Sequence, residues 1–325
     1  MRPRFALVML LGHLALLIAF IGSWQRSRLM LYDFHEVRSE ADVNLAPADL
    51  AARFGYVEDD VDQLAAFRAI AEPIVAGVAF SGDRARRLAD YIYALRHRDF
   101  NDVEGDVRRG PVALLTDMQK GEPANCGQMS TVLAAFWRSL GGHTRGVRWG
   151  TPEGAVGHYA LELWDDHARR WFYYDMNLNG YAVDDDYKTP LSIGALRANL
   201  LTGENLRMVS NLEQNDYTLA EFEQEIRDFP VEWYVLSNRS LNKEPGRRFG
   251  PLNRFQPWLV RLPNPLDRIL DNLTGDRDQR LIVAGRVEIV GLTSLAGGRL
   301  LVGYLAFAIL ACAFSLYRHR RTNTV

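Results

Sequence analysis

The chain has 325 residues and carries 38 Lys and Arg against 40 Asp and Glu, which gives a formal net charge of -2. This balance argues against a nucleic-acid partner, because phosphate binding needs an excess of basic side chains. The sequence contains no Cys-x-x-Cys pair, zinc spacing or Gly-rich phosphate loop, so we expect no cofactor and no metal ion. The two cysteines are too few for a disulfide framework.

The N-terminal 25 residues predict a membrane span. Residues 5–24, FALVMLLGHLALLIAFIGSW, form an apolar run with the length that a helix needs to cross a bilayer of roughly 30 Å. A cleaved signal peptide is the alternative. The run is long for that role, and the SWQRSR that follows shows no small-x-small cleavage pattern. We therefore expect residues 1–25 to remain as an anchor.

The C-terminus predicts a second span over residues 296–318, followed by a basic tail at 319–325. Residues 300–317 are uncharged. Basic residues lie at both outer ends of the chain, namely Arg2, Arg4, Arg318, Arg320 and Arg321. The positive-inside rule therefore places both termini in the cytoplasm, although Arg26, Arg28 and Arg299 weaken the bias. We expect a two-pass protein of a bacterial inner membrane, with its main domain in the periplasm.

The residues between the spans divide into three parts. We expect a helical connector over 26–79, a catalytic core over 80–200 and an accessory region near the membrane over 201–295. Within the core, SGDRARRLADYIYALRHRD at 81–99 predicts a helix, because its apolar residues recur at intervals of three and four. Arginines on that helix are typical of a solvated helix face.

A second helix is predicted directly after Cys126. Apolar residues from Met129 to Leu140 follow the spacing of a buried helix, which Gly141 and Gly142 end. Cys126 falls in its first turn, where free backbone amides and the helix dipole favour a thiolate. A nucleophile suits this position, and so does a small buried side chain. Cys312 lies in the predicted second span, so the two cysteines are not expected to form a disulfide.

Residues 157–177 predict a β-hairpin. HYALELW alternates, RRWFYYD is rich in aromatic residues, and DDHA lies between them as a four-residue loop. If Trp164 faces Arg169, the same register places His158 opposite Asp175. Directly opposed residues share a face of the sheet, so the carboxylate can bind and orient the imidazole. A slip of one residue would move the two to opposite faces.

Cys126, His158 and Asp175, in this order, resemble the catalytic triad of the transglutaminase-like superfamily, which shares its thiol chemistry with papain-like cysteine proteases. The resemblance covers residues 80–190. It includes the helix RLADYIYALRH, the stretch GEPANC with Gly127 and Ser130 after it, and the strand TRGVRW. The segments VGHYALELW and WFYYDMN carry the histidine and the aspartate. The resemblance implies an α+β fold, with the Cys126 helix packed on an antiparallel sheet that carries His158 and Asp175. The two transmembrane helices predicted from the apolar ends of the chain would flank this core.

The resemblance also implies thiol attack on a carboxamide or peptide carbonyl. Cys126 would be the nucleophile, His158 the base and Asp175 the residue that steadies the imidazolium. Gln119 is a candidate second donor to the oxyanion beside the Cys126 amide. Trp149 and Trp171 are candidates for the walls of a substrate cleft, with core packing as the alternative.

The sequence therefore predicts a membrane-anchored cysteine acyltransferase, amidase or peptidase that acts on a protein or peptide of the cell envelope. The alternative is a noncatalytic module of the same fold, bound to partners in an envelope or polysaccharide-assembly complex. The motifs do not separate hydrolysis from crosslinking, because that depends on whether an amine or water reaches the acyl-enzyme first.

Overall fold

The structure is a computed structural model of the whole chain. It describes residues 8–13, 15, 33–37, 40–95, 110–150, 157–184, 189–203, 206–210, 219–228, 231–238, 241, 279–283, 308, 311 and 314. Residues 34–253 and 279–286 belong to one compact unit, and the remaining residues to a second. The fold and the site described below belong to the first unit.

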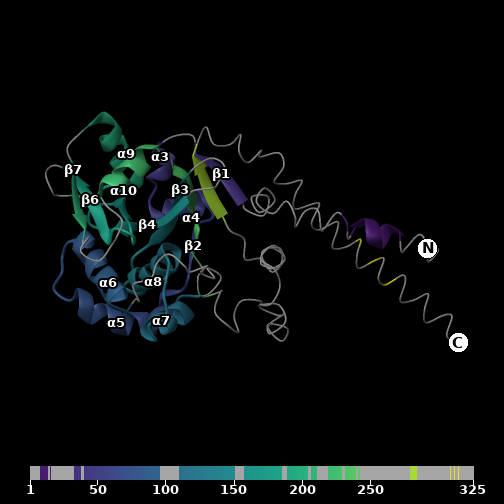
Figure 1. The fold of residues 1–325 in the computed structure, drawn as a ribbon, viewed down its shortest axis with the longest axis horizontal. Helices are drawn as coiled ribbons and strands as arrows, with labels where there is room; N and C mark the ends of the chain where they lie inside the picture. The colour runs from purple at the N-terminus through teal and green to yellow at the C-terminus, as the bar shows by residue number, and fades with distance from the viewer. Residues whose placement is uncertain are drawn as a thin grey trace. The chain divides into compact units, whose positions relative to one another are not determined.

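Helices and strands alternate irregularly along this unit (Figure 1). The helices are α3 (Glu40–Val43), α4 (Pro47–Phe54), η2, a 3-10 helix (Val61–Leu64), α5 (Ala65–Val75), α6 (Ser81–Leu95), α7 (Pro111–Gln119), α8 (Cys126–Ser139), α9 (Ile193–Thr202) and α10 (Leu219–Asp228). The strands are β1 (Asp33–Val37), β2 (Val57–Glu58), β3 (Thr144–Gly150), β4 (Gly157–Asp165), β5 (Arg170–Tyr174), β6 (Gly180–Asp184), β7 (Leu206–Ser210), β8 (Val231–Val235), β9 (Ser237–Asn238) and β10 (Gln279–Val283). The mixture of helices with antiparallel strand pairs agrees with the predicted α+β class.

The described strands include a six-stranded sheet in the order β1-β10-β8-β3-β4-β5. Strand β4 lies inside this sheet, antiparallel to β3 on one side and to β5 on the other. Its side chains alternate between two cores, as strand geometry requires. Leu161 and Leu163 belong to the core that includes helices α5 to α8, whereas Ala160 and Trp164 belong to the core that includes α4, α9 and α10. Figure 1 shows these two groups of helices on opposite sides of β4.

Helix α8 is the centre of the first core. Its apolar residues from Met129 to Trp137 are buried, which confirms the predicted buried stripe. Phe136 packs edge-on against Phe67 of α5 and Tyr91 of α6. The helix predicted over 81–99 is present as α6 over Ser81–Leu95, and the rest of that range lies outside the described residues.

Residues from outside the predicted catalytic core also contribute to the two cores. Leu50 and Phe67 come from the range predicted as a connector, and Phe222 and Leu241 come from the range predicted as an accessory region. All four side chains are buried. The boundaries predicted at residues 79 and 200 therefore run through one compact unit, because the predicted core alone does not cover both faces of its sheet.

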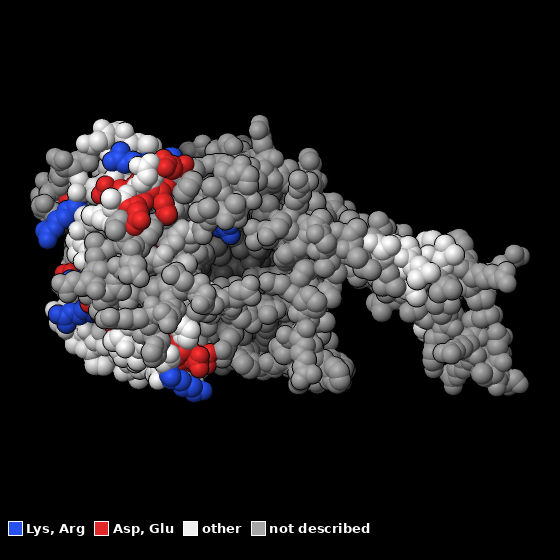
Figure 2. All heavy atoms as spheres, viewed as in Figure 1, with Lys and Arg blue, Asp and Glu red and all other residues white. Residues whose placement is uncertain are grey.

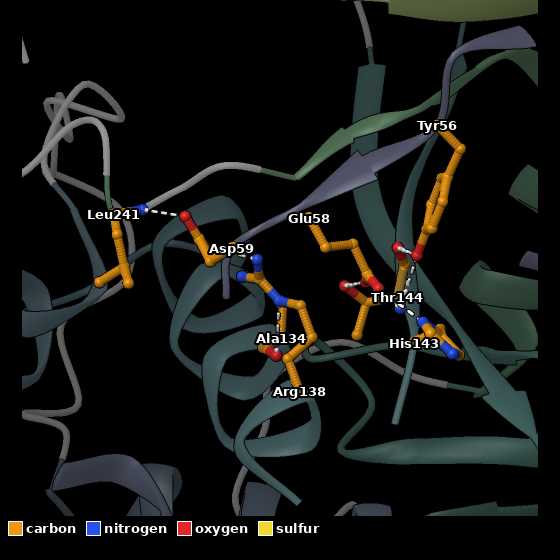
Figure 3. Close-up of polar contacts among 8 residues, drawn as sticks. All are labelled: Tyr56, Glu58, Asp59, Ala134, Arg138, His143, Thr144 and Leu241. Atoms are coloured by element: carbon orange, nitrogen blue, oxygen red, sulfur yellow. Dashed lines mark hydrogen bonds and ion pairs between the residues drawn. The ribbon is translucent and has the colours of Figure 1, made fainter. Parts of the chain in front are cut away.

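A polar cluster joins segments that are distant in the sequence (Figure 3). Arg138 of α8 donates to Asp59 Oδ2 over 2.6 Å, and the Leu241 amide donates to Asp59 Oδ1 over 3.0 Å. Glu58 of β2 accepts hydrogen bonds from the Thr144 amide and from His143, over 2.8 Å and 2.6 Å. The cluster thus fixes β2 and residue 241 against the C-terminal end of α8 and the start of β3.

Most residues of the two predicted membrane spans lie outside the described part of the chain. In the first span, residues 8–13 and 15 are helical, and in the second, residues 308, 311 and 314 are helical. No helix among the described residues is long and apolar enough to cross a membrane. Residues 243–267 of the predicted accessory region also lie outside the described residues.

The described surface carries charges of both signs. Figure 2 shows small groups of Lys and Arg side chains and small groups of Asp and Glu side chains on the described part of one face, several of them next to one another. This distribution is typical of a solvated surface with a net charge near zero.

Candidate active site

Cys126 is the first residue of helix α8, and a capping box fixes the helix start. The Asn125 side chain accepts a hydrogen bond from the Gln128 amide over 3.0 Å, and the Gln128 side chain accepts one from the Asn125 amide over 2.9 Å. The box holds the chain on both sides of Cys126 and leaves the Cys126 amide in the first turn, where amides have no partner within the helix. The thiol is free and partly exposed.

His158 and Asp175 bind each other at the edge of the β4–β5 pair. The distance from His158 Nε2 to Asp175 Oδ2 is 2.8 Å. The pair is buried, with 9% of His158 and none of Asp175 exposed. A carboxylate in this position selects the imidazole tautomer that carries its proton on Nε2 and leaves Nδ1 to face the other way.

The contact forms in a register different from the predicted one. The structure pairs Asp165 with Arg170 and Leu161 with Tyr174, so the register is shifted by two residues from the predicted pairing of Trp164 with Arg169. The Asp165 carboxylate causes this shift, because it accepts the His167 and Ala168 amides and closes the loop one residue later. A shift of two keeps every side chain on its face. His158 and Asp175 are therefore diagonal neighbours instead of directly opposed ones.

Asp175 accepts four hydrogen bonds. Oδ2 accepts from His158 and from the Tyr173 hydroxyl, and Oδ1 accepts from the backbone amides of Asn177 and Leu178 over 2.7 Å and 3.3 Å. Burial by itself would raise the pKa of this carboxyl group, but the His158 charge and the hydrogen bonds hold the pKa below its ordinary value. Asp175 is therefore a carboxylate with both oxygens engaged, and it has a fixed orientation.

The Cys126 sulfur meets His158 beyond the end of strand β5. The sulfur is hydrogen-bonded to the His158 side chain and to the Tyr159 backbone amide. Tyr159 lies two residues beyond the last β4–β5 pair, Leu161 with Tyr174, and it pairs with Arg148 of β3 on the other side of the strand. Since His158 Nε2 is bound to Asp175, the nitrogen left for the sulfur is Nδ1.

These contacts shift the pKa values of the thiol and the imidazole in opposite directions. Burial alone would raise the pKa of the Cys126 thiol, but the hydrogen bond and charge of His158 lower it below its ordinary value. Burial alone would lower the pKa of His158, but the charge and hydrogen bond of Asp175, together with Cys126, raise it to about 10. The two opposite shifts have one cause in common, because each of the two groups stabilises the charged form of the other and so favours a thiolate beside an imidazolium.

The other three predicted site residues do not contact the Cys126 sulfur in any interaction that the structure describes, although one of them packs against His158. Gln119 ends helix α7 with its side chain exposed, and no contact among the described residues joins it to Cys126. Trp171 is a core residue instead of a cleft wall: it is 1% exposed, and its indole nitrogen donates to the Leu45 carbonyl over 2.8 Å. Trp149 is also 1% exposed and packs behind the catalytic pair, with its ring centroid 4.8 Å from that of His158. Both aromatic side chains are needed to fill the core that includes α4, α9 and α10.

Sequence reasoning missed two polar residues at this site. Tyr173 shares Asp175 Oδ2 with His158, and the Asn177 side-chain nitrogen lies 3.4 Å from His158 Nδ1. The sequence could have indicated Tyr173, because it lies two residues before Asp175 and the two side chains therefore share one face of the strand. Asn177 follows the end of the strand, so strand alternation does not predict where its side chain points.

Residues 68–176 match the family model of the transglutaminase-like superfamily. The chain carries a transglutaminase-like domain. The matched residues begin in α5 and contain Cys126, His158 and Asp175. Comparison with curated proteins and with solved structures gave no match.

The transglutaminase-like domain is of the type found in cysteine hydrolases and acyltransferases, and its superfamily consists generally of cysteine-dependent enzymes. The arrangement of the three side chains fits that chemistry, because a thiol at a helix start, an imidazole and a buried carboxyl group are in contact in this order. Among the described residues, no group of three or more His, Cys, Asp and Glu is placed to hold a metal ion.

Proposed function

We propose that this protein is a membrane-anchored cysteine enzyme that cleaves amide or peptide bonds in a cell-envelope substrate, by acyl transfer or by hydrolysis. One observation carries the proposal: the imidazole that binds the Cys126 sulfur is itself bound to a fully buried carboxylate, over 2.8 Å. Such a chain of contacts activates a thiol and holds its base in one orientation.

The proposed reaction begins with attack of the Cys126 thiolate on the substrate carbonyl. The oxyanion that develops would accept a hydrogen bond from the Cys126 backbone amide, which points out of the first turn of α8. His158 then gives the proton on Nδ1 to the leaving nitrogen, and the carbon–nitrogen bond breaks as the thioester forms. Asp175 holds the imidazole in place throughout, because both of its oxygens are already engaged.

The pH dependence of Cys126 alkylation tests this proposal. In a Cys312→Ala background, iodoacetamide can react only with Cys126. We expect the alkylation rate to stay high well below the ordinary thiol pKa of about 8.5. His158→Ala should move the midpoint upward toward that value, because it removes the charge and hydrogen bond that lower the pKa of the thiol.

The control is a Cys126→Ala chain that keeps Cys312. Any labelling of this control should follow a different pH profile from that of Cys126. An ordinary midpoint in the Cys312→Ala chain, unchanged by His158→Ala, would favour a noncatalytic binding module in an envelope or polysaccharide-assembly complex. Where the midpoint is low, the mass of the adduct formed on Cys126 with cell-envelope extract identifies the acyl group of the substrate.

The membrane part of the proposal rests on the apolar ends of the chain and on the basic residues outside them. We propose two spans in a bacterial inner membrane, with the transglutaminase-like domain in the periplasm. A reporter fused to Val325 tests the orientation. We expect the activity of a reporter that lies in the cytoplasm. A signal typical of the periplasm would overturn the proposed orientation.

A further inference from the structure

Asn177 lies in a four-residue turn that the structure fixes on both sides. Asp175 and Gly180 exchange backbone hydrogen bonds of 2.9 Å and 3.1 Å around it. Within the turn, Asn179 adopts a left-handed conformation with φ of 46°, and its side chain binds Asp90 of α6 over 2.6 Å. The position of Asn177 relative to Asp175 and His158 is therefore set by the fold.

The Asn177 side chain lies against the imidazole. Its nitrogen Nδ2 lies 3.4 Å from His158 Nδ1, and it can donate a hydrogen bond to that atom only when Nδ1 carries no proton. The side-chain oxygen Oδ1 of Asn177 is buried and has no hydrogen-bond partner among the described residues. A buried carbonyl without a donor costs free energy, so such an atom in a reactive site calls for a functional reason.

The Asn177 side-chain amide and the Cys126 sulfur lie next to the same imidazole nitrogen. His158 Nε2 is occupied by Asp175, so both the sulfur and Asn177 Nδ2 meet at Nδ1. Nδ1 is the atom that accepts the proton of the nucleophile when an acyl group leaves the sulfur. Oδ1 belongs to the same carboxamide as Nδ2 and therefore lies close to Nδ1.

Simple geometry shows that one atom can reach both acceptors. The oxygen and nitrogen of one carboxamide are on the order of 2 Å apart. With Nδ2 at 3.4 Å from Nδ1, Oδ1 lies within about 6 Å of Nδ1. A nucleophile that makes two hydrogen bonds of about 3 Å each can bridge this separation.

We propose that Asn177 orients the nucleophile that attacks the acyl-enzyme, and that this nucleophile carries two hydrogens on its attacking atom, as a primary amine or water does. The inference rests on the proposed function, since it needs a thioester on Cys126. One hydrogen goes to His158 Nδ1, the second is held by Asn177 Oδ1, and the lone pair points at the thioester carbon.

The bonds balance in this step. The nucleophile lone pair forms the new bond to the acyl carbon, and one of its protons moves to His158 Nδ1. The carbon–sulfur bond breaks, and its electron pair stays on sulfur as the thiolate. The site returns to the thiolate beside an imidazolium with which the reaction began, while Asn177 keeps contact with the second hydrogen and exchanges no proton.

The test uses the full chain in detergent with p-nitrophenyl acetate as the acyl donor. The burst of p-nitrophenolate measures acetylation of Cys126, and mass spectrometry follows the loss of the acetyl group. Removal of the acetyl group is measured with water alone, with glycinamide, which has two amine hydrogens, and with sarcosinamide, which has one. Asn177→Leu removes both polar atoms at similar size, and Asn177→Ala is the second variant.

We expect both variants to acetylate within about twofold of the wild type and to lose the acetyl group about tenfold more slowly to water and glycinamide, as suits the loss of one hydrogen bond. With sarcosinamide the variants and the wild type should differ by less than about twofold, because Oδ1 has no second hydrogen to hold. An equal effect on glycinamide and sarcosinamide, or none on either, would overturn the inference while leaving the proposed function intact. Loss of the burst in both variants would also overturn it, since Asn177 would then act in acylation. Absence of a burst in the wild type would instead remove the proposed function itself.

Discussion

Asp175 is the residue on which the geometry of the site depends most directly. Its two oxygens accept a hydrogen bond from an imidazole, one from a phenol and two from backbone amides. Trp149 adds a further link, because its indole nitrogen lies 3.3 Å from the Tyr173 hydroxyl oxygen while its ring packs on His158. The imidazole is thus held at its edge by a charge and at its face by an aromatic ring.

Asp175→Asn should lower the pKa of His158 and, because less imidazolium then faces the sulfur, raise the pKa of the Cys126 thiol. The direct repulsion between the Asp175 charge and the thiolate acts the other way, but it is smaller than the contribution of His158. The carboxamide of asparagine has no negative charge. The charge of Asp175 is the main contribution that raises the pKa of His158 to about 10. The pH at which the rate of Cys126 alkylation falls off on the acid side should therefore move upward. Release of p-nitrophenolate should fall by at least about a hundredfold, as expected when the base loses its orienting carboxylate.

The matched control is Asp165→Asn on the same hairpin. Asp165 also accepts two backbone amides, but it closes the loop far from His158. Its substitution should leave the alkylation profile unchanged. If Asp175→Asn and Asp165→Asn gave the same profile as the wild type, the carboxylate would not act on the imidazole.

At the scale of the element, helix α8 serves both the core and the site. Its buried side chains pack against α5 and α6, and its first turn holds Cys126. The capping box at Asn125 and Gln128 joins these roles, because it decides where the helix begins. A helix that started one residue later would carry the Cys126 sulfur away from the Tyr159 amide.

Asn125→Ala should lower the free energy of unfolding by about 1 kcal/mol, because the Gln128 amide loses its acceptor. Asn125→Ser should recover most of this loss, since serine also caps helices well. Urea unfolding followed by circular dichroism measures both changes. An equal loss in the two variants would mean that Asn125 stabilises the helix through some contact other than its cap.

At the scale of the whole molecule, segments far apart in the sequence meet at buried charges. Arg138 and Asp59 form an ion pair with 2% of each side chain exposed, and Asp59 also receives the Leu241 amide (Figure 3). Arg145 and Glu162 form a second, fully buried pair, in which Arg145 also donates to the Val43 carbonyl and Glu162 accepts the Ile193 amide. These pairs tie both ends of the domain to its sheet.

Asp59→Ala should lower the free energy of unfolding by about 3–5 kcal/mol, because it leaves Arg138 buried without that carboxylate. Replacing both residues, as Asp59→Leu with Arg138→Met, should cost less than the single change. Arg53→Ala is the control: its ion pair with Asp42 involves an arginine side chain that is 55% exposed, so it should cost less than about 1 kcal/mol. Denaturant unfolding measures all three, and equal losses for Asp59→Ala and Arg53→Ala would contradict the expectation.

Local patterns alone identified the parts of the site. The periodic apolar residues after Cys126 predict a helix whose first turn holds the thiol, and the alternation around His158 and Asp175 predicts the hairpin that carries them. These predictions succeed because helix and strand periods are properties of short segments. They depend little on what the segments later contact.

Only the tertiary structure decided how the parts meet. The hairpin register depends on the Asp165 side chain, which closes the loop one residue later than the pattern implies, and the two-residue shift still joined His158 to Asp175. The meeting of Cys126 with the Tyr159 amide, the burial of Trp149 and Trp171, and the position of Asn177 at His158 Nδ1 all depend on packing between distant segments. Sequence periodicity carries no information about such contacts, because they are set by which strand ends where and by what covers each face of the sheet.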